Sequence, residues 1–148
     1  MDTNFSVSGE LVLTLKDEHG AVKDQRTVKN LVVTTGREYI ASRMIGTAAN
    51  IMSHIAIGTG IVDPVAGQGT LGTEIDRNAL STAATVTGPT VSYSALFPAG
   101  EGTGAITEAG IFNAASVGTM LCRTKFNVIN KGPLDTLTIN WNVTINAS

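Results

Sequence analysis

Charge, aromatic side chains and cysteine are all scarce in this sequence of 148 residues, and each scarcity excludes a class of protein. Charged residues make up 15% of the chain, with 10 basic against 12 acidic residues and a net charge of −2. This balance does not predict binding to nucleic acid or to an anionic membrane. A single cysteine, Cys122, excludes an internal disulfide and a cysteine-based zinc cluster. A surface this poor in charge suits a protein that packs against neighbouring proteins.

Long apolar runs are also missing. No segment approaches the roughly 18 apolar residues that a membrane-spanning helix needs. Met1 is followed by Asp2, Thr3 and Asn4, with no basic region leading into an apolar stretch, which predicts no secretory signal and a soluble protein in the cell that makes it. The length predicts a single domain over residues 1–148, with an N-terminal arm over about residues 1–5.

Alternating apolar and polar residues are abundant and predict β-strands. The clearest case is the run from Leu137 through Ile139, Trp141 and Val143 to Ile145, in which every second residue is apolar and turned inward. Further strands are expected at residues 5–17, 21–33, 51–57, 79–86, 91–97, 106–112 and 120–128. Gly20 is expected to take a positive φ in the first turn. Short strands separated by Gly and Pro indicate an all-β antiparallel sandwich or barrel.

One short helix is predicted around residues 36–45. Thr35 and Glu38 have the spacing of a capping box, and Gly46 stands where a left-handed helix end is expected. Ile40 and Met44 fall on one face of this helix. We therefore expect that face to cover an end of the core.

The motifs that suggest a cofactor or a metal lack the context that such sites require. Residues 67–72, GQGTLG, match a dinucleotide fingerprint by letter, but no buried strand precedes them and no helix follows, so a flexible loop is predicted. His19 and His54 lie far apart in the sequence without ligand spacing around them. The sequence predicts no cofactor and no metal site.

Cys122 and Glu108 lie inside predicted strands, where each side chain could have a chemical or a structural role. Cys122 falls on the inward face, opposite Arg123 and Lys125, and is interpreted as a buried apolar side chain. Glu108 is either a catalytic carboxylate or the partner of Arg123 or Arg77 in an ion pair that fixes strand register. Because no second carboxylate follows at hydrolase-like spacing, the ion pair is favoured and no enzyme activity is expected.

The stretch from residue 78 to residue 100 contains no charged residue. Such a stretch indicates the core of a protein interface. It is equally compatible with a central pair of strands that is covered on both faces. The sequence leaves both interpretations open.

Four stretches carry a resemblance to a known family. They are HIAIGTGIVDPVAGQGTLGTEIDR, VSYSALFPAG, TGAITEAGIFNAASVGTMLCRTKF and NKGPLDTLTINWNVTI. Over residues 28–145 the chain resembles small structural proteins of tailed bacteriophages, and more specifically the jelly-roll cement or decoration proteins of phage heads. The resemblance implies a jelly-roll-like β-sandwich that forms a homo-dimer or trimer and binds the major capsid protein. It also implies a place on the outer surface of the virion capsid after synthesis in the bacterial cytoplasm, with no enzyme activity, cofactor, nucleic acid or membrane partner.

The expected capsid contacts are a terminal arm and a long glycine-rich loop, since both kinds of segment can reach a neighbouring subunit. The predicted contact residues are Asp2, Thr3, Asn4, Phe5, Asp63, Pro64, Val65 and Gln68. The pattern IGTG, followed by proline, an acidic residue and arginine, also occurs in phage tail-fibre and baseplate proteins, which form the alternative. A carbohydrate-binding sandwich is a third possibility that the 5% aromatic content disfavours.

Overall fold

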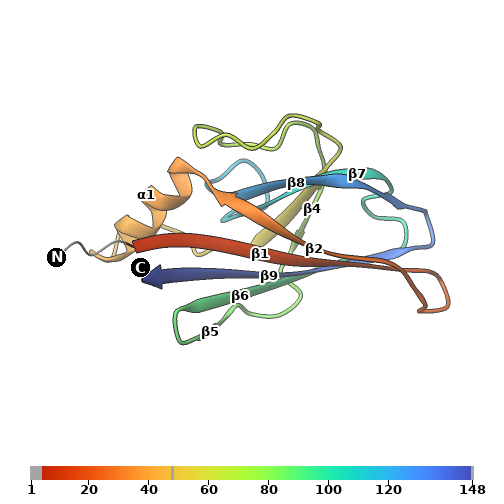
Figure 1. Cartoon of the computed structure of the whole chain (residues 1–148), viewed down its shortest axis with the longest axis horizontal. Coiled ribbons are helices and arrows are strands. Elements are labelled where there is room, and N and C mark those ends of the chain that lie inside the picture. The colour runs from red at the N-terminus through yellow and green to blue at the C-terminus, as the bar shows by residue number, and fades with distance from the viewer. Residues whose placement is uncertain (1–4, 48, 148) are drawn as a thin grey trace.

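The computed structural model describes residues 5–47 and 49–147, and it is an all-β structure with one short helix, as predicted (Figure 1). In the described part of the chain, no helix has the length and apolar character to cross a membrane. The elements are β1 (Phe5–Lys16), β2 (Val22–Val32), α1 (Thr34–Arg43), β3 (His54–Gly58), β4 (Glu74–Ala79), β5 (Thr85–Thr87), β6 (Thr90–Phe97), β7 (Gly104–Phe112), β8 (Met120–Lys131) and β9 (Thr136–Ala147).

The strands form one nine-stranded sheet in the order β4-β3-β7-β8-β2-β1-β9-β6-β5. All neighbouring pairs are antiparallel. The sheet is narrowest in the middle, where only Leu31 and Val32 of β2 pair with β8. It curls there, so that its two halves face each other and enclose one apolar cluster (Figure 1). The architecture is therefore sandwich-like, and the jelly-roll connectivity remains a prediction.

The core is built from the inward residues of both halves. Its largest buried apolar side chains are Trp141, Phe97, Leu11, Leu13, Ile55, Ile57, Ile106, Ile111 and Leu121. Phe112 and Met120 belong to a second buried cluster, together with Val33, Ala56 and Leu71. The predicted inward positions of Trp141 and Cys122 are confirmed. The indole Nε1 of Trp141 donates a hydrogen bond to Asn30 Oδ1 at 2.9 Å. Gly9 makes room for this amide, because a Cβ at Gly9 would lie 1.8 Å from the same Asn30 oxygen.

The prediction of a strand over residues 79–86 is wrong. The chain ends β4 at Ala79, leaves the sheet, and rejoins it as the short strand β5. The intervening residues 81–84 are small and exposed, so they have no apolar face with which to hold a place in the sheet. The expected strand over 51–57 likewise begins only at His54.

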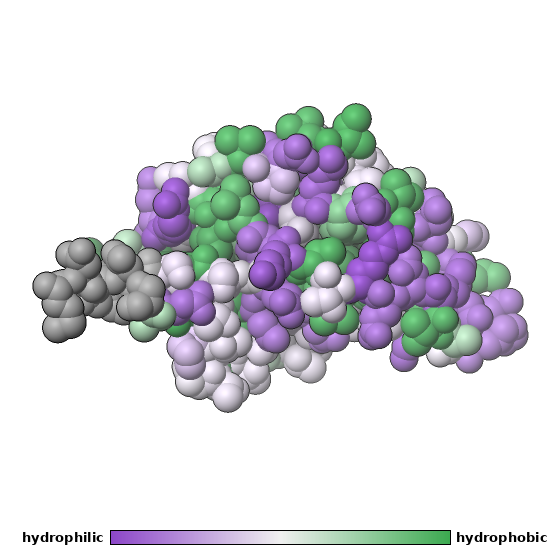
Figure 2. All heavy atoms as spheres, in the orientation of Figure 1, coloured by the Kyte–Doolittle hydropathy of each residue, from purple (hydrophilic) through white to green (hydrophobic). Residues whose placement is uncertain are grey.

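The interpretation of residues 78–100 as a central, doubly covered pair of strands is also wrong. β5 is the last strand of the sheet, and residues 81–89 are all exposed. Figure 2 shows weakly polar, pale residues over this region at the lower left of the view. The interface interpretation of the stretch remains a prediction.

The helix begins earlier than predicted and without the expected capping box. Its N-cap is Val33, which makes no side-chain hydrogen bond to the helix. The hydroxyl of Thr35 instead donates to the Met120 carbonyl oxygen on β8 at 2.9 Å. The tertiary hydrogen bond therefore replaces the local one.

The other end of the helix follows the sequence prediction more closely. Gly46 has φ of +69°, and Gly20 in the β1–β2 turn has φ of +83°, both as expected. Ile40 packs against the core, as predicted. Met44, predicted on the same buried face, is instead exposed, because the helix ends before it and the chain turns away.

Gly36, the buried residue of α1, generates a stability prediction. A Cβ at this position would lie 1.9 Å from the Leu121 carbonyl oxygen, so Gly36→Ala must push the helix away from β8. We expect a loss of about 1–3 kcal/mol in the free energy of unfolding, measured by urea denaturation. Gly67→Ala is the matched control, because nothing lies within 4 Å of its added Cβ, and it should change stability by less than ~1 kcal/mol. Equal effects of the two substitutions would contradict this packing.

Candidate functional site

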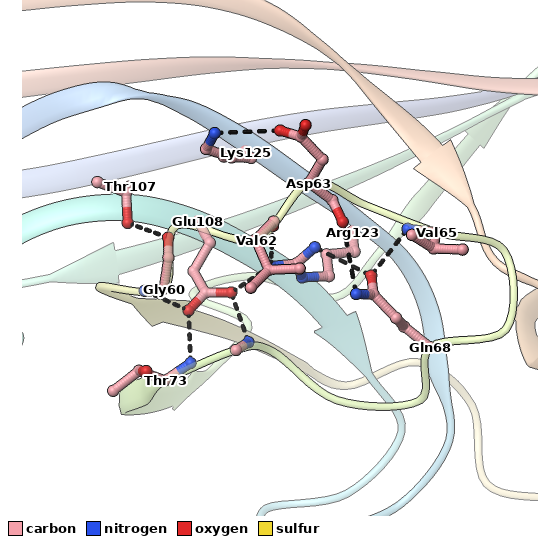
Figure 3. Close-up of polar contacts among 11 residues, drawn as sticks. Gly60, Val62, Asp63, Val65, Gln68, Thr73, Thr107, Glu108, Arg123 and Lys125 are labelled. Atoms are coloured by element: carbon pink, nitrogen blue, oxygen red, sulfur yellow. Dashed lines mark hydrogen bonds and ion pairs between the residues drawn. The ribbon is translucent and has the colours of Figure 1, made fainter.

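The loop between β3 and β4, residues 59–73, is the candidate functional site and is called the anchored loop below. It is the yellow-green segment at the top of Figure 1. Glu108 on β7 and Arg123 on β8 point toward it from the sheet, as Figure 3 shows. Both side chains are fully buried, and Arg123 Nη2 lies 2.8 Å from Glu108 Oε1.

The Glu108 carboxylate holds the two ends of the anchored loop together. Its Oε2 accepts backbone hydrogen bonds from Gly60 at 2.6 Å and from Thr73 at 2.7 Å. Its Oε1 accepts one from Gly72 at 2.7 Å, in addition to the Arg123 contact. Three backbone donors and one guanidinium thus surround a carboxylate that has no access to water. A buried charge needs such compensation to be tolerated.

Glycine is required where the loop backbone approaches this carboxylate. A Cβ at Gly60 would lie 2.3 Å from Glu108 Oε2, and a Cβ at Gly58 would lie 2.6 Å from the same oxygen. Any side chain there would displace the carboxylate from the backbone N–H groups. Gly58 and Gly60 therefore serve an internal anion contact, whereas nothing lies within 4 Å of a Cβ added at Gly67 or Gly69.

Arg123 fixes the middle of the anchored loop. Its Nη2 donates to the Val62 carbonyl oxygen at 2.8 Å, and its Nη1 donates to Gln68 Oε1 at 3.0 Å. The same Gln68 oxygen accepts the Val65 N–H at 2.9 Å. The loop backbone is thus held at its ends by Glu108 and at its centre by Arg123 (Figure 3).

The electrostatics of the buried pair favour its charged form. Burial acts to raise the pKa of Glu108, but hydrogen bonds from Thr73, Arg123, Gly72 and Gly60 outweigh burial and lower that pKa below its ordinary value. A second ion pair joins Asp63 to Lys125 at 3.0 Å near the surface. Glu108 therefore acts as a fixed anion that orders the loop.

While its backbone is held, the anchored loop turns apolar side chains outward. Ile61 is 76% exposed, and Val62 and Val65 are each 57% exposed. Apolar residues form the upper edge of the space-filling view over this loop (Figure 2). Ordered loops that expose several large apolar side chains are typical of protein contact sites.

The structure brings together four of the predicted contact residues. Asp63, Pro64, Val65 and Gln68 all lie in the anchored loop. Asp2, Thr3 and Asn4 lie outside the described residues. Phe5 begins β1, where its backbone pairs with Ala147.

A groove of about 460 Å³ connects the start of β1 with the anchored loop. Ser6, Val7 and Ser8 line one part of it, and Ala66 of the loop and Arg37 of α1 line another. Ala66, the neighbour of the predicted contact Val65, and the beginning of β1 therefore border one hollow of the surface.

Sequence reasoning missed part of this site. The ion pair of Glu108 with Arg123 is confirmed, whereas Arg77 pairs with Glu74 at 2.7 Å and lies over the Phe112 ring. What the sequence did not indicate is that the pair anchors a loop in addition to joining two strands. The signal was available in the glycines at 58, 60 and 72, since a buried carboxylate recruits backbone N–H groups where glycine allows close approach.

The two histidines and Cys122 do not join the anchored loop in one site. His54 Nδ1 lies 2.8 Å from Ser53 Oγ, and burial together with nearby Arg77 lowers the His54 pKa. His19 lies in the exposed β1–β2 turn beside Glu18. Burial raises the pKa of the Cys122 thiol well above its ordinary value. Within residues 5–47 and 49–147, no three His, Cys, Asp or Glu side chains form a metal-binding group.

Comparisons with protein-family models, with curated proteins and with solved structures found no match to this chain.

Glu108→Gln tests the anchoring role of the carboxylate. The substitution retains the shape of the side chain, but it leaves Arg123 without its buried counter-charge and turns an amide toward backbone donors. We expect a loss of about 3–5 kcal/mol in the free energy of unfolding, measured in urea. Asp63→Asn removes the exposed pair with Lys125 and should cost less than ~1 kcal/mol. Similar losses for both variants would rule out a special role for the buried pair.

The same carboxylate predicts a pH dependence with a defined sign. Because the folded pKa of Glu108 is lowered, its contribution to stability is complete above the unfolded carboxyl pKa and is lost as pH falls through the folded value. The stability difference between the wild type and Glu108→Gln should therefore shrink as the pH falls below about 4, the ordinary carboxyl range. Urea unfolding at each pH measures it, and the lowered pKa of Asp135 cancels because both proteins contain that group. A difference that stays constant down to the lowest pH would refute the assignment.

Proposed function

We propose that this chain is a structural protein of a tailed-phage virion, a cement or decoration protein that binds the outer surface of the head and bridges neighbouring capsid proteins. The observation that carries the proposal is the anchored loop, which presents Ile61, Val62 and Val65 to solvent from a backbone held by a buried ion pair. The resemblance of residues 28–145 to phage structural proteins supports the same reading.

An anchored loop suits a binding role because little conformational freedom is lost when it meets a partner. Ordering a loop on binding costs free energy that a preorganised loop does not lose. In this chain the loop is already ordered before binding, because the hydrogen bonds of Glu108 and Arg123 hold its backbone. The exposed apolar side chains can then contribute their burial directly to affinity.

The anchored loop contains one charged residue, Asp63. Asp63 is already matched by Lys125, so the loop offers a partner an apolar centre with a polar rim. A single contact of this size is modest in strength. On a closed shell, however, each copy meets identical neighbours, and many modest contacts together resist the separation of capsid subunits.

The groove beside the loop extends the proposed contact surface. It runs from the start of β1 to Ala66, so a segment of a capsid protein that seats on the loop also meets the first residues of β1. This proximity joins the loop and the first residues of β1 into one surface. No catalytic step is part of the proposed function.

The alternatives differ from this proposal in measurable ways. A tail-fibre or baseplate component resembles a head protein in fold but occurs in few copies. A carbohydrate-binding module needs an exposed aromatic platform, and Trp141, the single tryptophan, is fully buried. The geometry therefore favours a protein partner over a sugar.

Copy number in purified virions of the phage that encodes the chain is the first test. We expect a ratio to the major capsid protein of about one to one, or a simple fraction such as one to two, by quantitative mass spectrometry. A ratio of a few per cent or less would move the protein to the tail and end the cement proposal.

The loop itself is tested by binding of purified chain to heads that lack it. Ile61→Asp combined with Val62→Asp places charge on two exposed apolar positions and should weaken binding at least about tenfold without lowering the thermal midpoint of unfolding. Val22→Asp, at an equally exposed valine on β2, is the matched control and should bind normally. Undiminished binding of the loop variant would exclude the loop as the contact site.

A further inference from the structure

We propose that β5, Thr85–Thr87, is a self-association edge, at which a second copy of the chain adds its own β5 antiparallel about a two-fold axis and continues the sheet. The β5 edge is separate from the anchored loop. Pairing at this edge is a property of the isolated protein and does not depend on the proposed capsid function.

The edge is open along one side. β5 is the terminal strand of the sheet and, among residues 5–47 and 49–147, pairs only with β6, through Thr85↔Ser92, Val86↔Val91 and Thr87↔Thr90. The opposite side of β5 faces away from β6, and all three residues of β5 are exposed. An open strand edge of this kind is a template for another strand.

The two edges of the sheet differ in how they are protected. β4, at the other end, carries Glu74, Asp76 and Arg77, and charged residues are a common device against edge-to-edge pairing. β5 lies within residues 78–100, which contain no charge at all. When a strand edge pairs with a second copy of itself, any charged residue near the axis meets the same charge on the partner. The uncharged β5 edge can pair with itself without this repulsion.

The sequence of β5 is complementary to itself. If Val86 lies on the two-fold axis, antiparallel register places Thr85 opposite Thr87 of the second copy. Threonine pairs across strands are favourable, and all three residues of β5 are β-branched, which favours the strand conformation.

Apolar burial adds to the backbone pairing. Val86 continues a cross-strand row with Val91 on β6 and Val143 on β9, yet it is itself 71% exposed because the sheet ends there. In the two-fold arrangement, Val86 of the second copy lies beside it on the same face and extends the row. Each copy therefore covers the exposed apolar side chain of the other.

Pairing through so short a strand predicts a weak, concentration-dependent dimer. We expect a Kd between about 1 µM and about 1 mM for the full chain by sedimentation velocity. Val86→Asp places two carboxylates beside each other at the axis and should raise the Kd at least about tenfold. Val22→Asp alters an exposed valine outside the edge and should leave the Kd unchanged.

Cysteine cross-linking supplies a second measurement that does not depend on dimer strength. Val86→Cys should form an intermolecular disulfide under mild oxidation, because antiparallel pairs at the axis bring the two Cβ atoms close together. Val22→Cys should not, and the native Cys122 is buried and contributes nothing to either variant.

Two results would overturn the inference. One is a wild-type chain that stays monomeric up to about 1 mM. The other is a dimer that persists unchanged in Val86→Asp while Val86→Cys fails to cross-link, which would place the interface on another surface. Loss of virion binding by the loop variant, with the dimer intact, would separate the two surfaces.

Discussion

The hydrogen bonds around the Glu108 carboxylate are the interaction on which the arrangement of the site depends. Burying this charge costs free energy that only near-complete pairing offsets, and here Gly60, Gly72, Thr73 and Arg123 all donate to it. An apolar pair at the same positions would leave three backbone N–H groups without partners. The ion pair therefore selects one conformation of the β3–β4 connection, and the outward direction of the loop's apolar side chains follows from that choice.

The curl of the sheet is held by contacts between its two halves. The two halves of the sheet are continuous only through a short stretch of β2, so tertiary contacts hold them face to face. Polar contacts close the end beyond β8, where Lys131 Nζ donates to the carbonyl oxygens of Pro98 at 3.0 Å and Asp135 at 2.7 Å. Lys23 of β2 pairs with the Asp135 carboxylate at 2.7 Å. Buried polar contacts thus fix the loop and the closed end, while apolar packing fixes the middle.

The two proposed contact surfaces would bind their partners through different groups: side chains at the anchored loop and backbone groups at the β5 edge. The anchored loop offers side chains from a fixed backbone, which suits recognition of a differently shaped partner. The β5 edge offers backbone groups and an uncharged sequence, which suits pairing with an identical strand. Because the surfaces belong to different parts of the fold, a copy that is attached through its loop keeps its edge available, and weak pairing between attached copies is strengthened by their local concentration.

The elements that have a local sequence signal could be predicted before the structure. Period-two alternation predicted β1, β6, β7, β8 and β9 and the inward position of Trp141. The turn at Gly20 predicted β2 as the hairpin partner of β1, and Gly46 marked a second position that needs a positive φ. Tertiary structure decided the rest, because the deciding contacts join distant residues. Thr35 bonds to Met120 instead of capping its helix, residues 81–84 leave the sheet, and Glu108 reaches across the chain to Gly60 and Gly72. A strand pattern reports which face is apolar, but it does not report which loop covers the other face.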